Sequence, residues 1–263
     1  MQSVRLAERK YGEKAVGPPL VLLHGLLGSS RNWQSAGKQL GELLAVYALD
    51  LRNHGSSPHH SQMDYPSMAG DVLHWADGQG FAQFHILGHS MGGKVAMHLA
   101  CTFPERIASL TVVDIAPRAA PPRWEREFAI MRKMPVDRLR NRAEAEEWLE
   151  PDIRDWAFRK FLVSNLERKD HGGFRWIVNL DILHAALPNL FQQIPKDGER
   201  YEGPVLYIRG ERSRFVEDGD EPMIRGFFPR ARLVTIADAG HNVHFDQTER
   251  FVEVVLDNLN HVR

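Results

Sequence analysis

Residues 88 to 93 read Gly-His-Ser-Met-Gly-Gly, a Gly-x-Ser-x-Gly pattern centred on Ser90. An apolar run at residues 84 to 88 precedes the serine, and a helical pattern follows it. In this context the serine occupies a sharp turn between a strand and a helix, and small neighbours let the helix pack closely against the sheet. The pattern therefore predicts Ser90 as a nucleophile. It also predicts that the Met91 amide, at the helix start, stabilises an oxyanion.

A second pattern supplies the other oxyanion donor. Residues 24 to 29 read His-Gly-Leu-Leu-Gly-Ser and follow the apolar run at residues 19 to 23. Gly25 removes steric bulk, so the Leu26 amide can turn toward the site, and two backbone donors hold a tetrahedral oxyanion without reorganising. We interpret His24 as a residue that braces this loop by hydrogen bonds, with a role as the base as the alternative.

A serine hydroxyl is a poor nucleophile at neutral pH and needs a proton acceptor. His241 lies in Ala-Gly-His after the last predicted strand, late in the chain as the order Ser, Asp, His requires. His244 is the alternative base. Neither this pair nor the pair His59 and His60 has carboxylate or cysteine companions at metal-binding spacing, so we expect no metal.

The composition excludes several classes of protein. The 263 residues are 43% hydrophobic and 25% charged, as in ordinary folded domains, and the net charge of −1 offers no long-range field for nucleic acid. No apolar run approaches the roughly 18 residues of a membrane span. Residues 1 to 14 lack the apolar core of a secretion signal, so we expect a cytoplasmic protein. The single Cys101 is expected in the core, and no phosphate-binding glycine motif indicates a cofactor.

Apolar runs alternate with amphipathic stretches over most of the chain, which predicts a mostly parallel twisted sheet flanked by helices. Residues 118 to 200 break this rhythm: they contain no convincing strand, four of the six tryptophans, and several helical patterns. We expect a helical cap there, inserted after the sixth strand, with 1–117 and 201–263 as the catalytic core. Arg138, Arg140 and Arg142 are expected on a solvated helix face. The predicted strands are 4–10, 19–24, 46–50, 84–88, 110–114, 205–209 and 233–236, and the predicted helices are 33–44, 65–79, 91–103 and 248–260.

Across nearly its whole length the chain resembles the α/β-hydrolase superfamily, and within it the YbfF-type esterases. The resemblance implies an α/β-hydrolase fold, an α/β architecture with an inserted cap. Three of the matching motifs are common to the superfamily, whereas those at 52–55 and 113–117 are narrower. The matching segments are His-Gly-Leu-Leu-Gly-Ser at 24–29, Asp-Leu-Arg-Asn-His-Gly-Ser at 50–56, Gly-His-Ser-Met-Gly-Gly at 88–93, Asp-Ile-Ala-Pro at 114–117, Trp-Ile-Val-Asn-Leu-Asp at 176–181 and Ala-Gly-His at 239–241.

The acid departs from the commonest layout of the superfamily. That layout places an aspartate shortly after the strand predicted at 205–209, where this chain has Ser213. A hydroxyl cannot offset the charge of an imidazolium, so another acid is required. The resemblance implies Asp114, at the end of the strand that follows the nucleophile helix, with Ser213 as an auxiliary hydrogen-bond partner. The alternatives are Glu211, Asp218 and Asp181.

These residues predict a serine hydrolase that cleaves carboxylic esters or thioesters of short to medium acyl chains through an acyl-enzyme. Carbon–carbon hydrolases and cofactor-free haloperoxidases or perhydrolases keep the serine, so they remain alternatives. A catalytically dead hydrolase that serves as a binding module is the alternative outside the enzymes. The expected partner is a small-molecule ester or thioester, and the expected state is a monomer or a homodimer.

Overall fold

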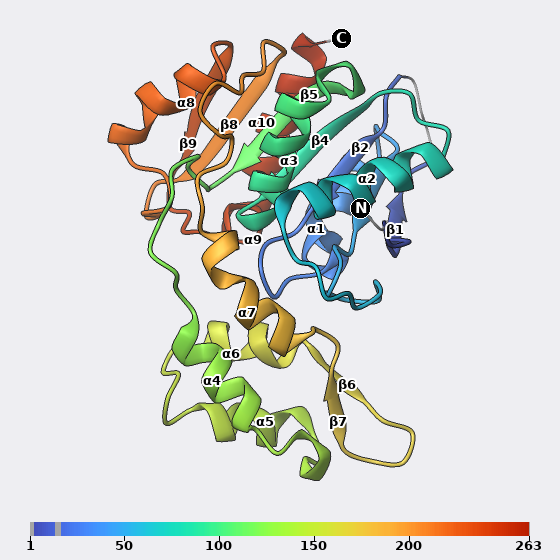
Figure 1. The fold of residues 1–263 in the computed structure, drawn as a ribbon, viewed down its shortest axis with the longest axis vertical. Helices are drawn as coiled ribbons and strands as arrows, with labels where there is room; N and C mark the ends of the chain where they lie inside the picture. Colours follow the sequence, from blue (N-terminus) through green and yellow to red (C-terminus); the bar gives the residue numbers. More distant parts are fainter. Residues whose placement is uncertain (1–2, 14–16, 263) are drawn as a thin grey trace.

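The computed structural model describes residues 3–13 and 17–262. Residues 1–2, 14–16 and 263 belong to the predicted core, and residues 1–2 and 14 also to the N-terminal stretch 1–14, but they lie outside the described residues. A seven-stranded sheet has the order β1-β3-β2-β4-β5-β8-β9 (Figure 1). All neighbouring strands are parallel except β1 and β3, which confirms the mostly parallel sheet. The strands are β1 Glu8–Tyr11, β2 Leu20–Leu23, β3 Val46–Leu49, β4 Phe84–His89, β5 Ile107–Val113, β8 Val205–Gly210 and β9 Ala231–Ile236.

Helices cover both faces of the sheet, and this is why the central strands are apolar throughout. Successive side chains of a strand point to opposite faces. In β2, Leu20 and Leu22 therefore pack in one buried cluster, and Val21 and Leu23 pack in the other. The helices of these two layers are α1 Gln34–Leu40, α9 Val243–Asp246 and α10 Thr248–His261 on the first face, and α2 Tyr65–Gly78, α3 Met91–Thr102 and α8 Glu221–Phe227 on the second.

The predicted boundaries hold for most elements, with differences at the ends. The expected first strand, 4–10, begins only at Glu8. The expected helix 33–44 begins with a 3-10 turn and its α-helical part ends at Leu40. Among residues 3–13 and 17–262, no helix has the length and apolar character needed to cross a membrane. The short 3-10 helices are η1 Ser30–Trp33, η2 Pro104–Arg106, η3 Val136–Arg138 and η4 Asp218–Asp220.

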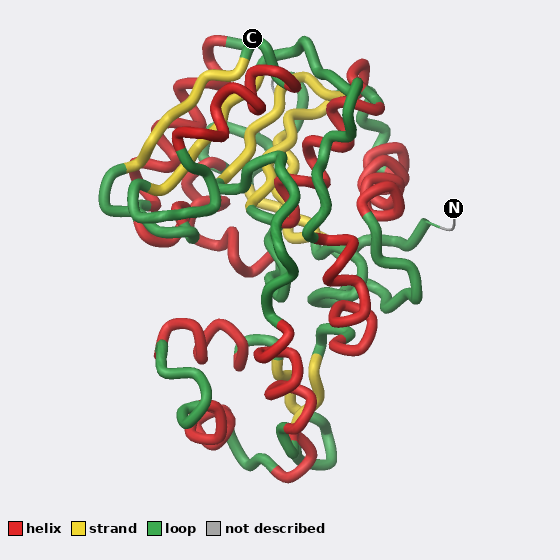
Figure 2. Tube along the Cα trace, turned by 60° about the vertical axis from the view of Figure 1, so that its left-hand side comes forward, coloured by secondary structure: helices red, strands yellow, loops and turns green. Residues whose placement is uncertain are grey.

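The segment between β5 and β8 forms a separate lobe beside the sheet (Figure 2). It follows the fifth strand of the described residues and not the sixth, and the described residues before β2 form a single strand, β1. The lobe also contains an antiparallel hairpin that the sequence did not predict, because its three-residue strands include exposed charged residues and no apolar run. Its elements are α4 Glu125–Lys133, α5 Arg142–Leu149, α6 Trp156–Val163, β6 Leu166–Arg168, β7 Phe174–Trp176 and α7 Leu180–Leu190.

The basic tract in this lobe does not share one helix face. Arg138 ends η3, Arg140 lies in the turn that follows, and Arg142 is the first residue of α5. The expected continuous helix is interrupted because Leu139 adopts an extended conformation at the end of η3. All three arginines are exposed, which confirms that their side chains are solvated. The prediction that they share one helix face is wrong.

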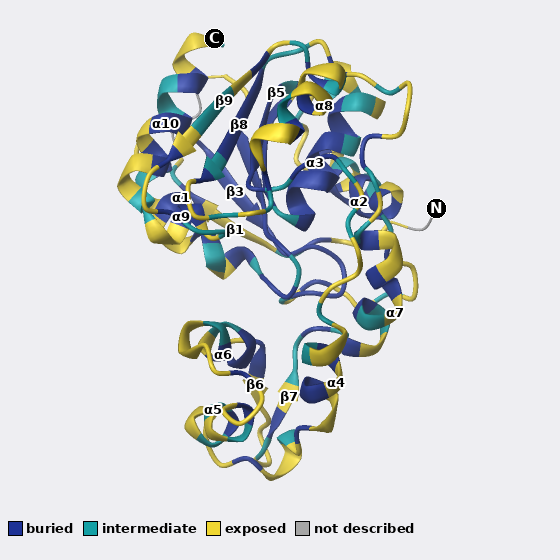
Figure 3. Cartoon of the chain, turned by 90° about the vertical axis from the view of Figure 1, so that its left-hand side faces the viewer, coloured by how far each residue is buried: buried dark blue, intermediate teal, exposed yellow. Residues whose placement is uncertain are grey.

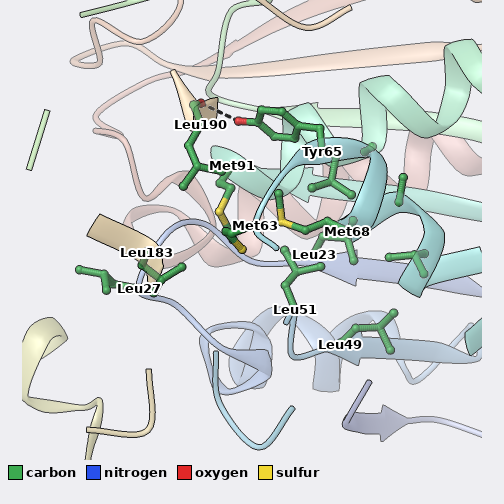
Figure 4. Packing of buried hydrophobic residues seen from close by; sticks show 14 of the residues in the cluster. Leu23, Leu27, Leu49, Leu51, Met63, Tyr65, Met68, Met91, Leu183 and Leu190 are labelled. Atoms are coloured by element: carbon green, nitrogen blue, oxygen red, sulfur yellow. Dashed lines mark hydrogen bonds between the residues drawn. The ribbon is translucent and has the colours of Figure 1, made fainter. Parts of the chain in front are cut away.

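Buried residues are continuous from the sheet into the lobe (Figure 3). The same hydrophobic cluster contains Leu23 and Leu49 of the sheet and Leu183 and Leu190 of α7 (Figure 4). The Tyr65 hydroxyl, at the start of α2, donates a hydrogen bond of 2.6 Å to the Leu190 carbonyl. The lobe is therefore packed against the sheet layers and not merely tethered to them.

Candidate active site

Ser90 lies between β4 and α3 in a strained conformation, with φ of 53° and ψ of −118°. Residues other than glycine rarely adopt positive φ, and such strain recurs at functional sites. The neighbouring glycines allow the close approach of helix and strand. A Cβ atom at Gly88 would lie 2.1 Å from the Gly92 carbonyl oxygen, and one at Gly92 would lie 2.6 Å from the Leu23 oxygen. The predicted strand-to-helix turn is therefore present, with glycines where the packing requires them.

The loop after β2 passes directly over this turn. A Cβ atom at Gly25 would lie 3.2 Å from the Ser90 Cβ, so the loop could not approach as closely with a larger residue. A hydrogen bond of 3.0 Å from the Gly28 amide to the Gly25 carbonyl closes a tight turn. Leu26 occupies the first inner position of that turn, where its own amide takes no part in the closing bond. Leu26 and Met91 line the same cavity as Ser90.

Two buried histidines fasten this loop to the loop after β3. The Leu51 amide donates to Nε2 of His24 at 3.0 Å, and the Leu27 amide donates to Nε2 of His54 at 3.1 Å. In each ring Nδ1 then carries the proton and donates to a backbone carbonyl. Burial lowers the pKa of both imidazoles, that of His54 to about 3, so both stay neutral. His24 thus braces the loop, and His54, which sequence reasoning missed, does the same from the other side.

His241 and Asp114 meet at the carboxyl edge of the sheet. Nδ1 of His241 lies 2.8 Å from Oδ2 of Asp114, and the carboxylate is completely buried. The Gly210 amide donates to the other oxygen of Asp114 at 3.1 Å, and the Ser213 hydroxyl donates to Oδ2. The Phe215 ring stacks on the His241 ring with centroids 3.7 Å apart. The imidazole is therefore held both by a carboxylate and by an aromatic face.

Ser90 and His241 line one cavity, with no hydrogen bond between their side chains in this structure. A contact between such groups is often longer in an unliganded site than in the reacting complex. His89, the residue before the serine, donates from Nε2 to the His241 carbonyl at 2.9 Å. Burial and the two neighbouring histidines His241 and His244 hold the pKa of His89 well below its usual value. This neutral ring connects the His241 loop to the serine turn. In the sequence, the position of His89 inside the Gly-x-Ser-x-Gly motif is the only signal of this role.

The other candidates from the sequence have different surroundings. His244 lines the same cavity, but its ring is buried against the Trp33 ring, with centroids 4.3 Å apart, and no acid contacts it. In the part of the chain that the structure describes, no three histidine, cysteine or acidic side chains gather as metal ligands would. The three alternative acids have other partners: Glu211 accepts from the Asp238 amide, Asp218 pairs with Arg209, and Asp181 pairs with Arg132.

The cavity above Ser90 has a volume of about 350 Å³ and lies between the sheet edge and the lobe. Its walls are mainly apolar and aromatic, as is usual for small-molecule sites. Of the tryptophans in the lobe, only Trp124 is among the lining residues. The tyrosine, tryptophan and phenylalanine side chains of the wall are Tyr65, Trp124, Phe158, Phe161, Phe191, Phe215 and Phe245.

Comparison with known proteins agrees with this geometry. The profile of the alpha/beta hydrolase family matches residues 20–254. The sn-1-specific diacylglycerol lipase ABHD11 of Xenopus tropicalis is 37% identical over 260 residues, which cover 96% of this chain and 81% of that protein. Esterase YbfF of Escherichia coli is 30% identical over 245 residues, which cover 92% of this chain and 93% of that protein. The structure of a marine microorganism esterase superposes with a TM-score of 0.93 at 37% identity, and the match covers 97% of this chain and 99% of that protein. The chain belongs to the alpha/beta hydrolase family.

Proposed function

We propose that the chain is a serine ester hydrolase in which Ser90, His241 and Asp114 form the catalytic triad. Family membership and the relatives named as lipase and esterases support the ester-hydrolysing activity. The contact of 2.8 Å between His241 and the buried Asp114, beside the strained Ser90 turn, is the observation that carries the assignment of the residues.

In this mechanism Nε2 of His241 takes the Ser90 proton as the oxygen attacks the ester carbonyl, and the imidazolium then protonates the leaving group. Asp114 keeps the proton on Nδ1 and stabilises the imidazolium. Ser213 and the Gly210 amide orient Asp114 through its two oxygens. Water, activated by His241, then releases the acid from the acyl-enzyme.

The amides of Leu26 and Met91 are proposed to stabilise the oxyanion of each tetrahedral intermediate. Donors fixed before the reaction need no reorganisation as charge develops, and one such donor is worth about 10²- to 10³-fold in kcat. The Met91 amide is the first in α3, so it has no partner within the helix and the helix dipole favours negative charge there.

We propose that residues 118–200 act as a cap over the core formed by 1–117 and 201–263. The cap supplies Trp124, Phe158 and Phe161 to the cavity wall. A mainly apolar cavity of about 350 Å³ favours esters or thioesters of short to medium acyl chains. The proposed partner is thus a small molecule that enters between cap and sheet.

The test is a panel of p-nitrophenyl esters and acyl thioesters, with diketone and peroxide assays beside it. We expect ester hydrolysis by the wild type and its loss in Ser90→Ala. A fluorophosphonate probe should label the wild type and not this variant. Activity on diketones alone would indicate a carbon–carbon hydrolase, and equal labelling of folded wild type and variant would indicate a binding module.

A further inference from the structure

Asn165 is a buried residue of the lobe at the open end of the β6 and β7 hairpin, whose connecting loop points away from the sheet (Figure 1). Its amide donates to the Leu162 carbonyl at 3.1 Å, and its carbonyl accepts from the Ile177 amide at 2.9 Å. With its backbone held in this way, the side chain has a defined direction. Its Nδ2 donates a hydrogen bond of 2.8 Å to the carbonyl of Leu27, which is 138 residues earlier in the chain.

Leu27 belongs to the loop that crosses over Ser90, and its backbone is strained. Its φ of 59° is a conformation that a branched residue adopts only when the surroundings impose it. The amide of Leu27 is held by His54, and its carbonyl is held by Asn165. The two peptide planes that flank Leu27 are therefore both anchored, one from the core and one from the lobe.

The Leu26 amide belongs to the peptide plane before these two, and the same tight turn holds all three planes in place. Leu26 and Leu27 are the two inner residues of the turn closed between Gly28 and Gly25. If Leu27 relaxed to negative φ, the turn would change type and the peptide between Leu26 and Leu27 would flip. The Leu27 amide would then lose its bond to His54, and the loop that carries the Leu26 amide would be free to shift relative to Ser90. An oxyanion donor that is displaced by about 1 Å loses much of its effect.

We propose that Asn165 is a positioning residue for catalysis: its side-chain amide holds the Leu27 carbonyl and thereby keeps the Leu26 amide directed at the oxyanion. The inference rests on the proposed function, in which Leu26 stabilises the oxyanion. The lobe would then take part in catalysis, because one of the hydrogen bonds that hold the loop over Ser90 comes from the inserted segment and not from the hydrolase core.

Asn179 offers a matched control. It is also an asparagine of the lobe that contacts a core loop, since its amide donates to the Asn53 carbonyl at 3.0 Å and its Nδ2 lies 3.3 Å from Asn53 Oδ1. Its side chain caps the N-terminus of α7 by accepting from the Ile182 amide. It makes no hydrogen bond to the loop over Ser90. Removing it costs about 1 kcal/mol of stability through the lost cap.

The experiment compares wild type, Asn165→Ala and Asn179→Ala in hydrolysis of a p-nitrophenyl ester and in thermal unfolding. For Asn165→Ala we expect kcat to fall about 10-fold with KM changed less than about twofold, because a loosened donor costs less than a deleted one. An alkylboronic acid, which mimics the tetrahedral adduct on a serine, should bind about 10-fold more weakly to this variant. Asn179→Ala should keep kcat and boronic acid affinity within about twofold at a similar or greater loss of stability.

If Asn165→Ala does not fold, Asn165→Leu, which fills the space but donates nothing, takes its place in the same comparison. Wild-type kcat and boronic acid affinity in a folded Asn165 variant would overturn the inference, as would an equal fall of kcat in Asn179→Ala. In either case hydrolysis by the wild type and its loss in Ser90→Ala would leave the proposed function intact. Absence of Ser90-dependent hydrolysis in the wild type would overturn both.

Discussion

The Ser213 hydroxyl donates a hydrogen bond to Oδ2 of Asp114, the same oxygen that His241 contacts through Nδ1. The two residues are 99 positions apart and lie after the adjacent parallel strands β8 and β5. Ser213 stands where the superfamily often has the acid, and in the proposed triad Asp114 takes that role from the neighbouring strand. Because carboxyl ends of neighbouring parallel strands share one edge of the sheet, either position reaches the same histidine.

Asp114→Asn should lower kcat by about 10⁴-fold, the effect of neutralising a triad acid, because an amide no longer stabilises the imidazolium or its tautomer. Ser213→Ala should cost only about 10-fold, since the Gly210 amide still orients the carboxylate. Steady-state hydrolysis of a p-nitrophenyl ester measures both effects. Asp218→Asn is the control, because its side chain is 92% exposed and pairs with Arg209. Near-normal kcat in Asp114→Asn would rule out this acid.

Gly88→Ala should destabilise the fold by about 3 kcal/mol or more, because its Cβ would lie 2.1 Å from the Gly92 carbonyl oxygen and neither backbone can yield. Urea unfolding followed by circular dichroism gives the change in free energy of unfolding. Gly78→Ala, at the end of α2, is the control. A Cβ there meets nothing within 4 Å, so this change should stabilise by about 0.5 kcal/mol. A loss below about 1 kcal/mol in Gly88→Ala would contradict the close packing of α3 on the sheet.

Lys94, one turn beyond Ser90, is buried and donates from Nζ to the carbonyls of Arg118 and Gln192, at the two ends of the inserted lobe. Burial, together with the charges of Arg118 and Lys196, lowers its pKa to about 8. Between about pH 8 and pH 10.5 the unfolded chain holds this proton and the folded chain releases it, so stability rises with pH across that window.

The free energy of unfolding of the wild type should therefore rise by up to about 3 kcal/mol relative to Lys94→Met between pH 8 and pH 10.5. Below pH 8 the difference should be constant, because the lysine is charged in both states. Urea unfolding at a series of pH values measures the difference, in which other titrating groups cancel. If the difference in free energy of unfolding between wild type and Lys94→Met does not change between pH 8 and pH 10.5, burial does not lower the pKa of Lys94.

Acid should destabilise the protein through its buried neutral histidines. Burial lowers the pKa of His54 and His244 to about 3, whereas the unfolded residues titrate near 6.5. The unfolded chain binds more protons between these values, so stability is lost as the pH falls from about 6.5 toward 3. His244→Phe should lose less stability than the wild type between pH 7 and pH 4.5, and the exposed His171→Gln should behave like the wild type. Equal losses in all three proteins would contradict this account.

The serine turn and the parallel sheet could be predicted from the sequence because both depend on local chemistry. A glycine two positions on either side of Ser90, after an apolar run, specifies a strained turn whatever surrounds it. His241 followed from its place late in the chain. The short strands β6 and β7 were not predicted, because their pairing depends on neighbours in the lobe and their residues show no apolar pattern. The sequence did not predict that His89 bonds to the His241 carbonyl or that the Phe215 ring stacks on His241, because contacts between residues far apart in the chain produce no pattern in the spacing of residues.

The sequence by itself determined the class of fold, the turn that holds the candidate nucleophile and the existence of an inserted segment, since steric demands and hydrophobic periodicity act over a few residues. The resemblance implied Asp114 as the acid, but only the tertiary structure shows the contact of this carboxylate with His241 and the hydrogen bonds that hold the loop over Ser90. Asp114 is 127 residues from His241, and Asn165 is 138 residues from Leu27. Such contacts arise only when the sheet and the lobe pack together, because the orientation of a buried side chain is determined by the elements around it and not by its neighbours in the chain.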